Sequence, residues 1–232
     1  EDEPLIAGVD VSDGGAAWNV VRFRRGADAR SIPPVRVPGS SVRGDRGPFL
    51  GKLAEILKGD YDGRKVAMMF VDSAFGAPYV ERLHVMGFRN VEEVRFGSES
   101  LDHHQANLRA YMWNRMKEWL PSAVIDPKDR KLEIDLTSPG YHISKQDKLV
   151  IEAKEAMQKR GVDSPDDADA LCFEGVTRIL TPTGDVEINR VGVGDIVSTP
   201  FGPSEVTQVH ESVARRLTTA RFSNGSELRG TP

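Results

Sequence analysis

The chain has 232 residues, of which 39% are hydrophobic and 28% charged, and its formal net charge at pH 7 is −4. This composition predicts a soluble globular protein with one domain of ordinary size and a smaller second one, and it argues against a protein that coats nucleic acid through bulk charge. A single cysteine excludes an internal disulfide framework and fits a reducing cytoplasm. The longest apolar run, residues 66–71, is too short to cross a bilayer, and the acidic N-terminus lacks a signal-peptide pattern.

Strand and helix signals alternate through the first half of the chain. Two β-branched runs around the Gly14-Gly15 pair predict a hairpin. The elements expected there, in order, are strands at 4–11, 17–24 and 34–37, a helix at 49–57 that ends at Gly59, a strand at 66–72, a helix from about 77 to Gly87, and a strand at 91–96. Such alternation implies a parallel portion of sheet that is covered by helices.

The second half divides into a helical part and a part rich in strand signals. A helical stripe of apolar residues covers 107–120, two segments at 132–136 and 141–143 flank a Ser-Pro-Gly turn, and helices are expected at 149–160 and from Asp166 onward. After Leu171 only short apolar segments remain, separated by Gly, Pro and Asn turns, which is typical of an all-β unit. We therefore expect one domain at residues 1–171 and a second at 172–232.

Acidic residues occur at three well-separated points of the first predicted domain. Asp10 and Asp72 each end a strongly apolar strand, and Asp166, Asp167 and Asp169 lie at the start of a helix. Hard divalent cations take carboxylate oxygens as ligands, and two ions bridged by carboxylates cut phosphodiesters. Two plainer interpretations remain open: an Asp at a strand end is often a turn former, and acids after Ser-Pro suit the positive end of a helix dipole.

Six segments taken in chain order resemble the nuclease domain of the large terminase subunit of tailed phages. They are GVDVSDGG, FVDSAFGAPYVERLHVMGF, VEEVRFGSES, NLRAYMWNRMKEWL, KLVIEAKEAMQKRG and SPDDADAL, and the likeness extends over essentially residues 5–171. The resemblance implies an RNase H-like α/β fold, with a mixed five-stranded sheet whose first three strands are antiparallel. It also implies an endonuclease that cuts concatemeric DNA in the cytoplasm of an infected bacterial host. Its partners would be double-stranded DNA and, through the full-length protein, the small terminase subunit and the portal, with no membrane.

The resemblance assigns roles to the acidic residues. Asp10 and Asp72 match acids at the ends of two neighbouring strands, and Asp10 would bridge two Mg²⁺ or Mn²⁺ ions. One ion would generate the attacking hydroxide, and the other would stabilise the leaving 3′ oxygen. Asp166 and Asp169 share a helix face and rank above Asp167, which points about 100° away, although related members use adjacent acids. Candidate phosphate contacts are Arg22, Arg24, Lys148, Lys154 and Lys159.

Two departures from the family and one pair of histidines bear on function. Many relatives carry another acid and a Thr where this chain has AAWN at 16–19, so we expect no auxiliary ligand there. No GxxxxGK[ST] phosphate loop occurs, so we expect no ATPase motor in this chain and no DNA translocation by it alone. His103 and His104 follow a strand without an evident carboxylate or cysteine arrangement, and are expected to be exposed polar residues rather than ligands.

The segment that begins at Cys172 resembles a different family. CFEGVTRILTPTGDVEINRVGVGDIV is similar to the N-terminal block of an intein or another Hint-fold protein, and NGSELRGTP resembles the approach to the second block. Thr231 fits that block, and its expected His would fall beyond Pro232, which implies an incomplete intein. Cys172 would then attack the carbonyl of Leu171 in the acyl shift that begins protein splicing. The plain alternative is a buried helix cysteine.

Two other functions remain open for the first domain. One is another RNase H-like nuclease, such as a junction resolvase, which dimerisation and a preference for branched DNA would support. The other is a non-catalytic module that grips DNA and whose acids only bind ions.

Overall fold

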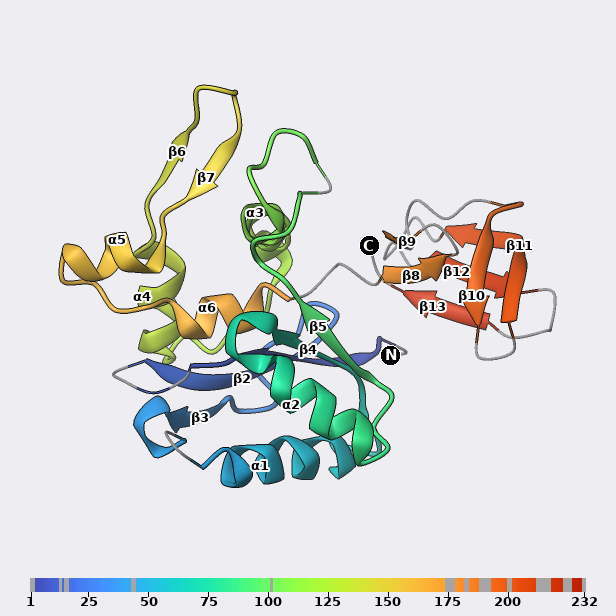
Figure 1. The fold of residues 1–232 in the computed structure, drawn as a ribbon, viewed down its shortest axis with the longest axis horizontal. Coiled ribbons are helices and arrows are strands. Elements are labelled where there is room, and N and C mark those ends of the chain that lie inside the picture. Colours follow the sequence, from blue (N-terminus) through green and yellow to red (C-terminus); the bar gives the residue numbers. More distant parts are fainter. Residues whose placement is uncertain are drawn as a thin grey trace. The chain divides into compact units, whose positions relative to one another are not determined.

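A five-stranded mixed sheet organises the first part of the chain (Figure 1). Its strands, in the order β3-β2-β1-β4-β5, are β3 Val35–Pro38, β2 Trp18–Arg25, β1 Leu5–Asp10, β4 Val66–Asp72 and β5 Val91–Val94. The strands β1, β2 and β3 are antiparallel, whereas β1, β4 and β5 are parallel. The β-branched and apolar runs of the sequence lie in these strands, and the mixed five-stranded sheet expected from the resemblance is confirmed.

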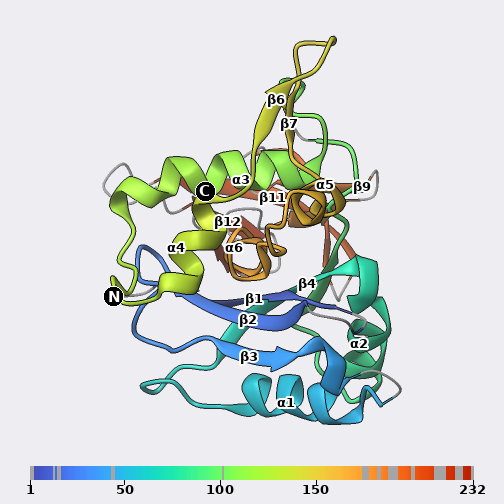
Figure 2. The ribbon, with the colours of Figure 1, turned by 90° about the vertical axis from the view of Figure 1, so that its left-hand side faces the viewer.

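Helices cover both faces of this sheet (Figure 2). On one face lie α1 Gly47–Lys58 and α2 Ser73–Val85; on the other lie α3 Leu108–Trp119, α4 Arg130–Thr137, α5 Lys154–Lys159 and α6 Asp166–Leu171. Short 3-10 turns occur at Gly39–Ser41 and Leu120–Ser122. The apolar faces of α1 and α2 pack on the sheet, with fully buried side chains that include Phe49, Leu53 and Leu83. Burial of this apolar stripe is the main force that holds the layer to the sheet.

Three segments differ from the sequence-based expectation. Helix α2 begins earlier, at Ser73, because the carboxylate of Asp72 accepts a hydrogen bond from the Ala74 amide and so caps the helix. The segment 132–136 is helical in α4, where Asp129 caps the N-terminus through the amide of Leu132. The helix expected at 149–160 is a strand, β7 Leu149–Ile151, followed by α5. The Leu-Val-Ile run favours the strand, which pairs with β6 Tyr141–Ile143 in a projecting hairpin (Figures 1 and 2).

The computed structural model describes residues 3–12, 14, 17–42, 45–100, 102–173, 178–181, 184–187, 193–199, 202–211, 218–222 and 227–230. These belong to two compact units, residues 1–174 and 175–232. The division lies beyond the expected Leu171/Cys172 boundary because Cys172 and Phe173 are buried in the first unit. The ring of Phe173 stacks on that of Phe96, with centroids 4.9 Å apart.

The second unit consists of strands in its described part. A two-stranded antiparallel sheet contains β8 Arg178–Thr181 and β9 Gly184–Glu187. A four-stranded antiparallel sheet has the order β10 Ile196–Thr199, β11 Gly202–Glu211, β12 Thr218–Phe222 and β13 Glu227–Gly230. Thr231 and Pro232 lie outside the described residues, as does Ala16 of the first unit. None of the helices within the described ranges has the length and hydropathy needed to span a bilayer.

Helix α6 approaches strand β1 closely at Gly8. A Cβ atom at this position would lie 2.0 Å from the carbonyl oxygen of Ala170 and 3.1 Å from the side chain of Phe173. Any larger residue would push the helix away from the sheet, so glycine is required for this packing. The close approach brings the acidic first turn of α6 toward the end of β1.

Candidate metal centre

The two strand-end carboxylates lie at the same edge of the sheet. Strands β1 and β4 are parallel neighbours, with Val9 opposite Val71, so Asp10 and Asp72 leave the sheet at the same end. Both are buried, with 1% and 5% of their surface exposed. Because the two strands are otherwise apolar and covered on both faces, their last residues place negative charge where water is largely excluded.

Helix α6 adds two further carboxylates to this edge. One oxygen of Asp166 accepts a hydrogen bond from the backbone amide of Trp18 on β2, at 2.8 Å. Asp169 is completely buried and is held by α3: its Oδ1 accepts hydrogen bonds from Arg109 Nε at 3.0 Å and from Trp113 Nε1 at 2.8 Å. These bonds fix the rotamer of Asp169.

The ammonium group of Lys154 lies among three of these carboxylates. Its Nζ is 2.9 Å from Asp10 Oδ2, 3.2 Å from Asp169 Oδ2 and 3.7 Å from Asp166 Oδ1. Lys154 is the first residue of α5, and its contacts join that helix to β1 and α6. The three carboxylates raise the pKa of Lys154 despite the opposing effect of its burial. A positive charge therefore occupies the middle of the cluster.

The pKa values of the acidic residues are shifted by their burial and by one another's charge. Burial raises the pKa of Asp10 well above its usual value, and the nearby Asp169, Asp166 and Asp72 add to this effect while Lys154 opposes it. Burial also raises the pKa of Asp72. For Asp169, burial works in the same direction, but Arg109 and Lys154 outweigh it and lower the pKa.

The donor type, carboxylate oxygen, suits a hard divalent cation, while no three of these carboxylates, which all belong to described residues, bring ligand atoms within 4.8 Å of one another in the arrangement with Lys154 among them. Four carboxylates face two cationic side chains, Lys154 and Arg109, so the cluster retains an excess of negative charge when all its members are ionised. The Oδ1 atom of Asp10 is buried and accepts no hydrogen bond from any residue that the structure describes. A buried oxygen without a partner is costly, and a hard cation such as Mg²⁺ or Mn²⁺ would satisfy it.

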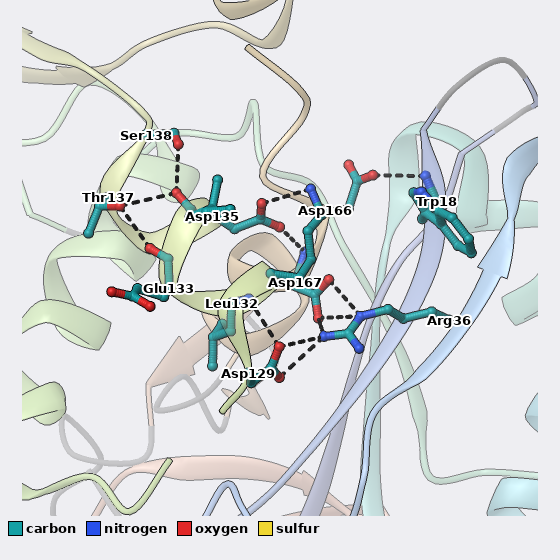
Figure 3. A network of polar contacts seen from close by, with 12 residues as sticks. Trp18, Arg36, Asp129, Leu132, Glu133, Asp135, Thr137, Ser138, Asp166 and Asp167 are labelled. Atoms are coloured by element: carbon teal, nitrogen blue, oxygen red, sulfur yellow. Dashed lines mark hydrogen bonds and ion pairs between the residues drawn. The ribbon is translucent and has the colours of Figure 1, made fainter. Parts of the chain in front are cut away.

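Asp167 lies outside this cluster, in a separate ion-pair network (Figure 3). Its carboxylate binds Arg36, at 2.8 Å, and Arg22, and both arginines also contact Asp129, the cap of α4. The backbone amide of Asp167 donates to Asp135 at 2.9 Å. Burial raises the pKa of Asp135 to about 6. This network ties α6 to β2, β3 and α4.

The other predicted cations lie in different surroundings. Arg22 donates a hydrogen bond to Asp167 and belongs to its ion-pair network. The guanidinium of Arg24 lies 3.5 Å from the ring centroid of Trp119, and burial lowers the pKa of Arg24 to about 8. Arg24 pairs in register with Ile6, far along β1 from Asp10. Lys148 lies next to β7, and Lys159 is exposed at the end of α5. Of the five cations, only Lys154 enters the carboxylate cluster.

Arg109 and Trp113 were missed as site residues. Trp113 belongs to the apolar stripe of a predicted helix, where core packing is the expected role, and Arg109 lies on the same helix without a motif around it. Only the fold brings their N–H groups to Asp169, and no spacing in the sequence signals it.

Cys172 lies beneath the cluster as the C-cap residue of α6. Its thiol is fully buried and donates a hydrogen bond to the carbonyl oxygen of Asp169 at 3.1 Å. Burial raises the pKa of this thiol well above its usual value, and Asp169 adds to the effect. The group is therefore a neutral thiol in this arrangement.

The fold is similar to those of several phage nucleases of known structure. The nuclease domain of the large terminase subunit gp2 of bacterial virus Sf6 matches with a TM-score of 0.56 and 20% identity, over 73% of this chain and 86% of that one. A lysine-to-alanine variant of the same domain with manganese matches with a TM-score of 0.56 and 17% identity, over 73% and 87%. The large terminase nuclease from thermophilic phage G20c matches with a TM-score of 0.52 and 16% identity, over 74% and 81%. Neither a protein-family model nor a curated protein sequence matches the chain.

Proposed function

We propose that the first unit is a divalent-metal-dependent DNA endonuclease of the large-terminase type. The observation that carries this proposal is that Asp10, Asp166 and Asp169 meet around the ammonium group of Lys154 at one buried edge of the sheet, where Asp72 ends the strand next to that of Asp10. The likeness in fold to terminase nuclease domains supports it, and one of those structures contains manganese.

These four carboxylates would hold two Mg²⁺ or Mn²⁺ ions. When bound, the ions supply a metal-activated water and stabilise the leaving 3′ oxygen of the cut phosphodiester. Strand β1, which ends at Asp10, neighbours β4 and packs against α6, so Asp10 would hold an ion together with Asp72 or with the acids of α6. Arg109 and Trp113 hold Asp169 in one orientation, and such outer contacts tune the ligand without touching the substrate.

Lys154 has a distinct part in this mechanism. Its ammonium neutralises Asp10 and Asp169 in the metal-free protein and so lowers the cost of burying them. An ion held by these carboxylates would lie close to the Nζ atom, and repulsion between the two positive charges would favour movement of the ammonium toward solvent, where it could contact a phosphate of the DNA.

The proposed substrate is double-stranded concatemeric DNA, cut during packaging in the cytoplasm of an infected bacterium. An ATPase motor, the small terminase subunit and the portal would act with this nuclease through the full-length protein. Two alternatives are a junction resolvase with the same chemistry and a module that grips DNA without cutting it. No feature of the site favours either one.

Nicking of a supercoiled plasmid in Mn²⁺ tests the proposal. We expect the parent chain to nick and linearise the plasmid, and Asp10→Asn and Asp72→Asn each to abolish cutting. Glu81→Gln, on the exposed face of α2, is the matched control and should retain activity. Full activity in both aspartate variants would refute the metal-site assignment, no activity in the parent would favour the gripping module, and a strong preference for four-way junctions would favour a resolvase.

For the rest of the chain, we infer that residues 172–232 form the N-terminal part of an intein inserted in the last nuclease helix. Two observations support this inference. The elements described from 178 to 230 are all strands, and α6 ends at Leu171, where the Hint-like sequence pattern begins. Cys172 would be the splicing nucleophile, and the acyl shift would require its thiol to leave the buried position beside Asp169.

A further inference from the structure

The loop between β5 and α3 contains a cluster that the sequence did not reveal. The expectation that His103 and His104 lack a carboxylate partner is wrong, because the Asp102 carboxylate contacts both. Its Oδ1 atom lies 3.0 Å from Nδ1 of His104 and 3.7 Å from Nδ1 of His103. The two imidazole rings are tilted by 39° to each other, with centroids 3.8 Å apart. Each residue offers one ligand atom, and these three atoms lie within 4.8 Å of one another.

We propose that Asp102, His103 and His104 bind a single transition-metal ion of the Zn²⁺ class. A tetrahedral zinc ion is about 2.0–2.1 Å from its nitrogen and oxygen ligands, which places those ligands about 3.4 Å apart. The observed separations of 3.0 and 3.7 Å bracket this value. Imidazole nitrogen selects Zn²⁺, Ni²⁺ or Cu²⁺ over Mg²⁺, so this site differs in chemistry from the carboxylate cluster.

The backbone around the three residues is already ordered for such a site. The loop is closed at its neck, where the amides of Leu108 and Arg109 donate to the carbonyls of Ser98 and Phe96 at 2.9 and 3.0 Å. Near its tip, the amide of Leu149 on β7 donates to the carbonyl of His104 at 2.6 Å. The carboxylate of Asp102 is oriented by the amide of His104, at 2.9 Å.

The two histidines are largely exposed to solvent, which favours a surface site with water among the ligands. The side chains of His103 and His104 are 85% and 67% exposed, so water can fill the remaining coordination positions and exchange freely. An ion here would join the side chains of three consecutive residues, next to the carbonyl of His104 that accepts the Leu149 amide of β7, and so would restrict these side chains locally.

Titration calorimetry with Zn²⁺ on the tag-free 232-residue protein tests the proposal. Asp10→Asn with Asp72→Asn serves as the background, so that the carboxylate cluster does not contribute. We expect one saturable site, and at least a tenfold loss of affinity in His103→Ala and in His104→Ala. His142→Ala is the matched control, because this exposed histidine lies on β6 and outside the cluster, and its affinity should be unchanged.

A second measurement identifies the ligands directly. The Co²⁺ complex should show visible bands of a nitrogen- and oxygen-bound ion, and the amides of residues 102–107 should exchange more slowly with zinc present. Binding that survives both histidine substitutions would overturn the proposal, as would a thiolate charge-transfer band that placed the ion on Cys172. Unfolding midpoints of the metal-free variants equal to that of their parent would show that the loss is not one of folding.

Discussion

The Nζ atom of Lys154 lies 2.9 Å from Oδ2 of Asp10, which joins residues 144 positions apart in the chain. The same ammonium contacts Asp169 at 3.2 Å. A divalent ion bound by these carboxylates would lie close to this ammonium, and the two positive charges would repel each other. Lys154 is therefore expected to lower the affinity of these carboxylates for a divalent ion.

Lys154→Met should raise the affinity for Mn²⁺ about tenfold, because it removes a positive charge from the ion's position. It should also lower the stability of the metal-free protein, since three buried carboxylates lose their common partner, and Mn²⁺ should restore that stability. Calorimetric titration and thermal unfolding with and without Mn²⁺ measure both effects. Lys159→Met, at the exposed end of α5, should change neither. An unchanged Mn²⁺ affinity in Lys154→Met would place the ion elsewhere.

Asp10→Asn should stabilise the metal-free protein at pH 7 while it removes activity. Burial raises the pKa of Asp10 in the folded protein above its unfolded-state value. The folded state therefore holds the carboxyl proton more tightly, and the free energy of unfolding is highest below the unfolded-state pKa of Asp10. It falls as the pH rises through the folded-state pKa, because a buried carboxylate must then carry its charge. Asparagine does not ionise, so the Asp10→Asn variant does not lose this free energy of unfolding at pH 7. Denaturant unfolding in EDTA should show a gain that shrinks on acidification. A lower free energy of unfolding than the parent at pH 7 would contradict the raised pKa.

Asp166→Asn and Asp169→Asn should each reduce nicking more than Asp167→Asn does. Only the first two carboxylates lie at Lys154. Asp167→Asn should instead cost about 3 kcal/mol of stability, because it leaves Arg22 buried with one fewer charged partner. Nicking rates at saturating Mn²⁺ and urea unfolding separate the two effects. A reversed ranking of activity would mean that Asp167 reaches the ions.

Gly8→Ala should displace α6 and weaken both stability and Mn²⁺ binding. The added Cβ would lie 2.0 Å from the carbonyl oxygen of Ala170. A backbone atom cannot move away from this clash unless the helix itself shifts. The matched control is Gly51→Ala in α1, where a Cβ meets nothing within 4 Å. That change should raise stability by about 0.5–1 kcal/mol through helix propensity. Equal Mn²⁺ affinity in Gly8→Ala and the parent would show that α6 does not need this contact.

The 232-residue chain should not cleave between Leu171 and Cys172 when it is incubated with dithiothreitol. The acyl shift needs a thiolate, and burial raises the pKa of the Cys172 thiol, which donates to the Asp169 carbonyl. Mass spectrometry after incubation measures the outcome, with Cys172→Ser as the control. Efficient thiol-induced cleavage in the parent alone would show that Cys172 reaches a reactive position.

The sequence predicted the five-stranded sheet well because β1 and β4 carry nearly continuous apolar runs and because β-branched residues recur in β2, β3 and β5. It also placed Asp10 and Asp72 at strand ends, and the i, i+3 spacing selected Asp166 and Asp169 over Asp167. Within the segment 149–160 the helix was predicted to begin too early, since the first three residues pair with β6 and α5 begins at Lys154. Cross-strand pairing of this kind overrides local helical spacing.

The polar contacts of the site were beyond sequence-based prediction. Arg109 and Trp113 reach Asp169 from a helix whose stripe indicates only core packing. Lys154 was named as one of five candidate cations, without a reason to prefer it. The side-chain network of Asp167 likewise depends on β2, β3 and α4 meeting in space. Partners so far apart in sequence leave no periodic signal.

The arrangement of the carboxylates also sets an order of assembly during synthesis. All five strands lie within the first 94 residues, whereas α6 is the last helix of the first unit. A chain leaving the ribosome can therefore form its sheet, with Asp10 and Asp72 side by side, well before Asp166 and Asp169 emerge. Contacts between such distant segments form late in folding. If the proposed nuclease function holds, the nascent protein would thus lack a complete carboxylate cluster, and could not cut DNA, until α6 docks at Gly8.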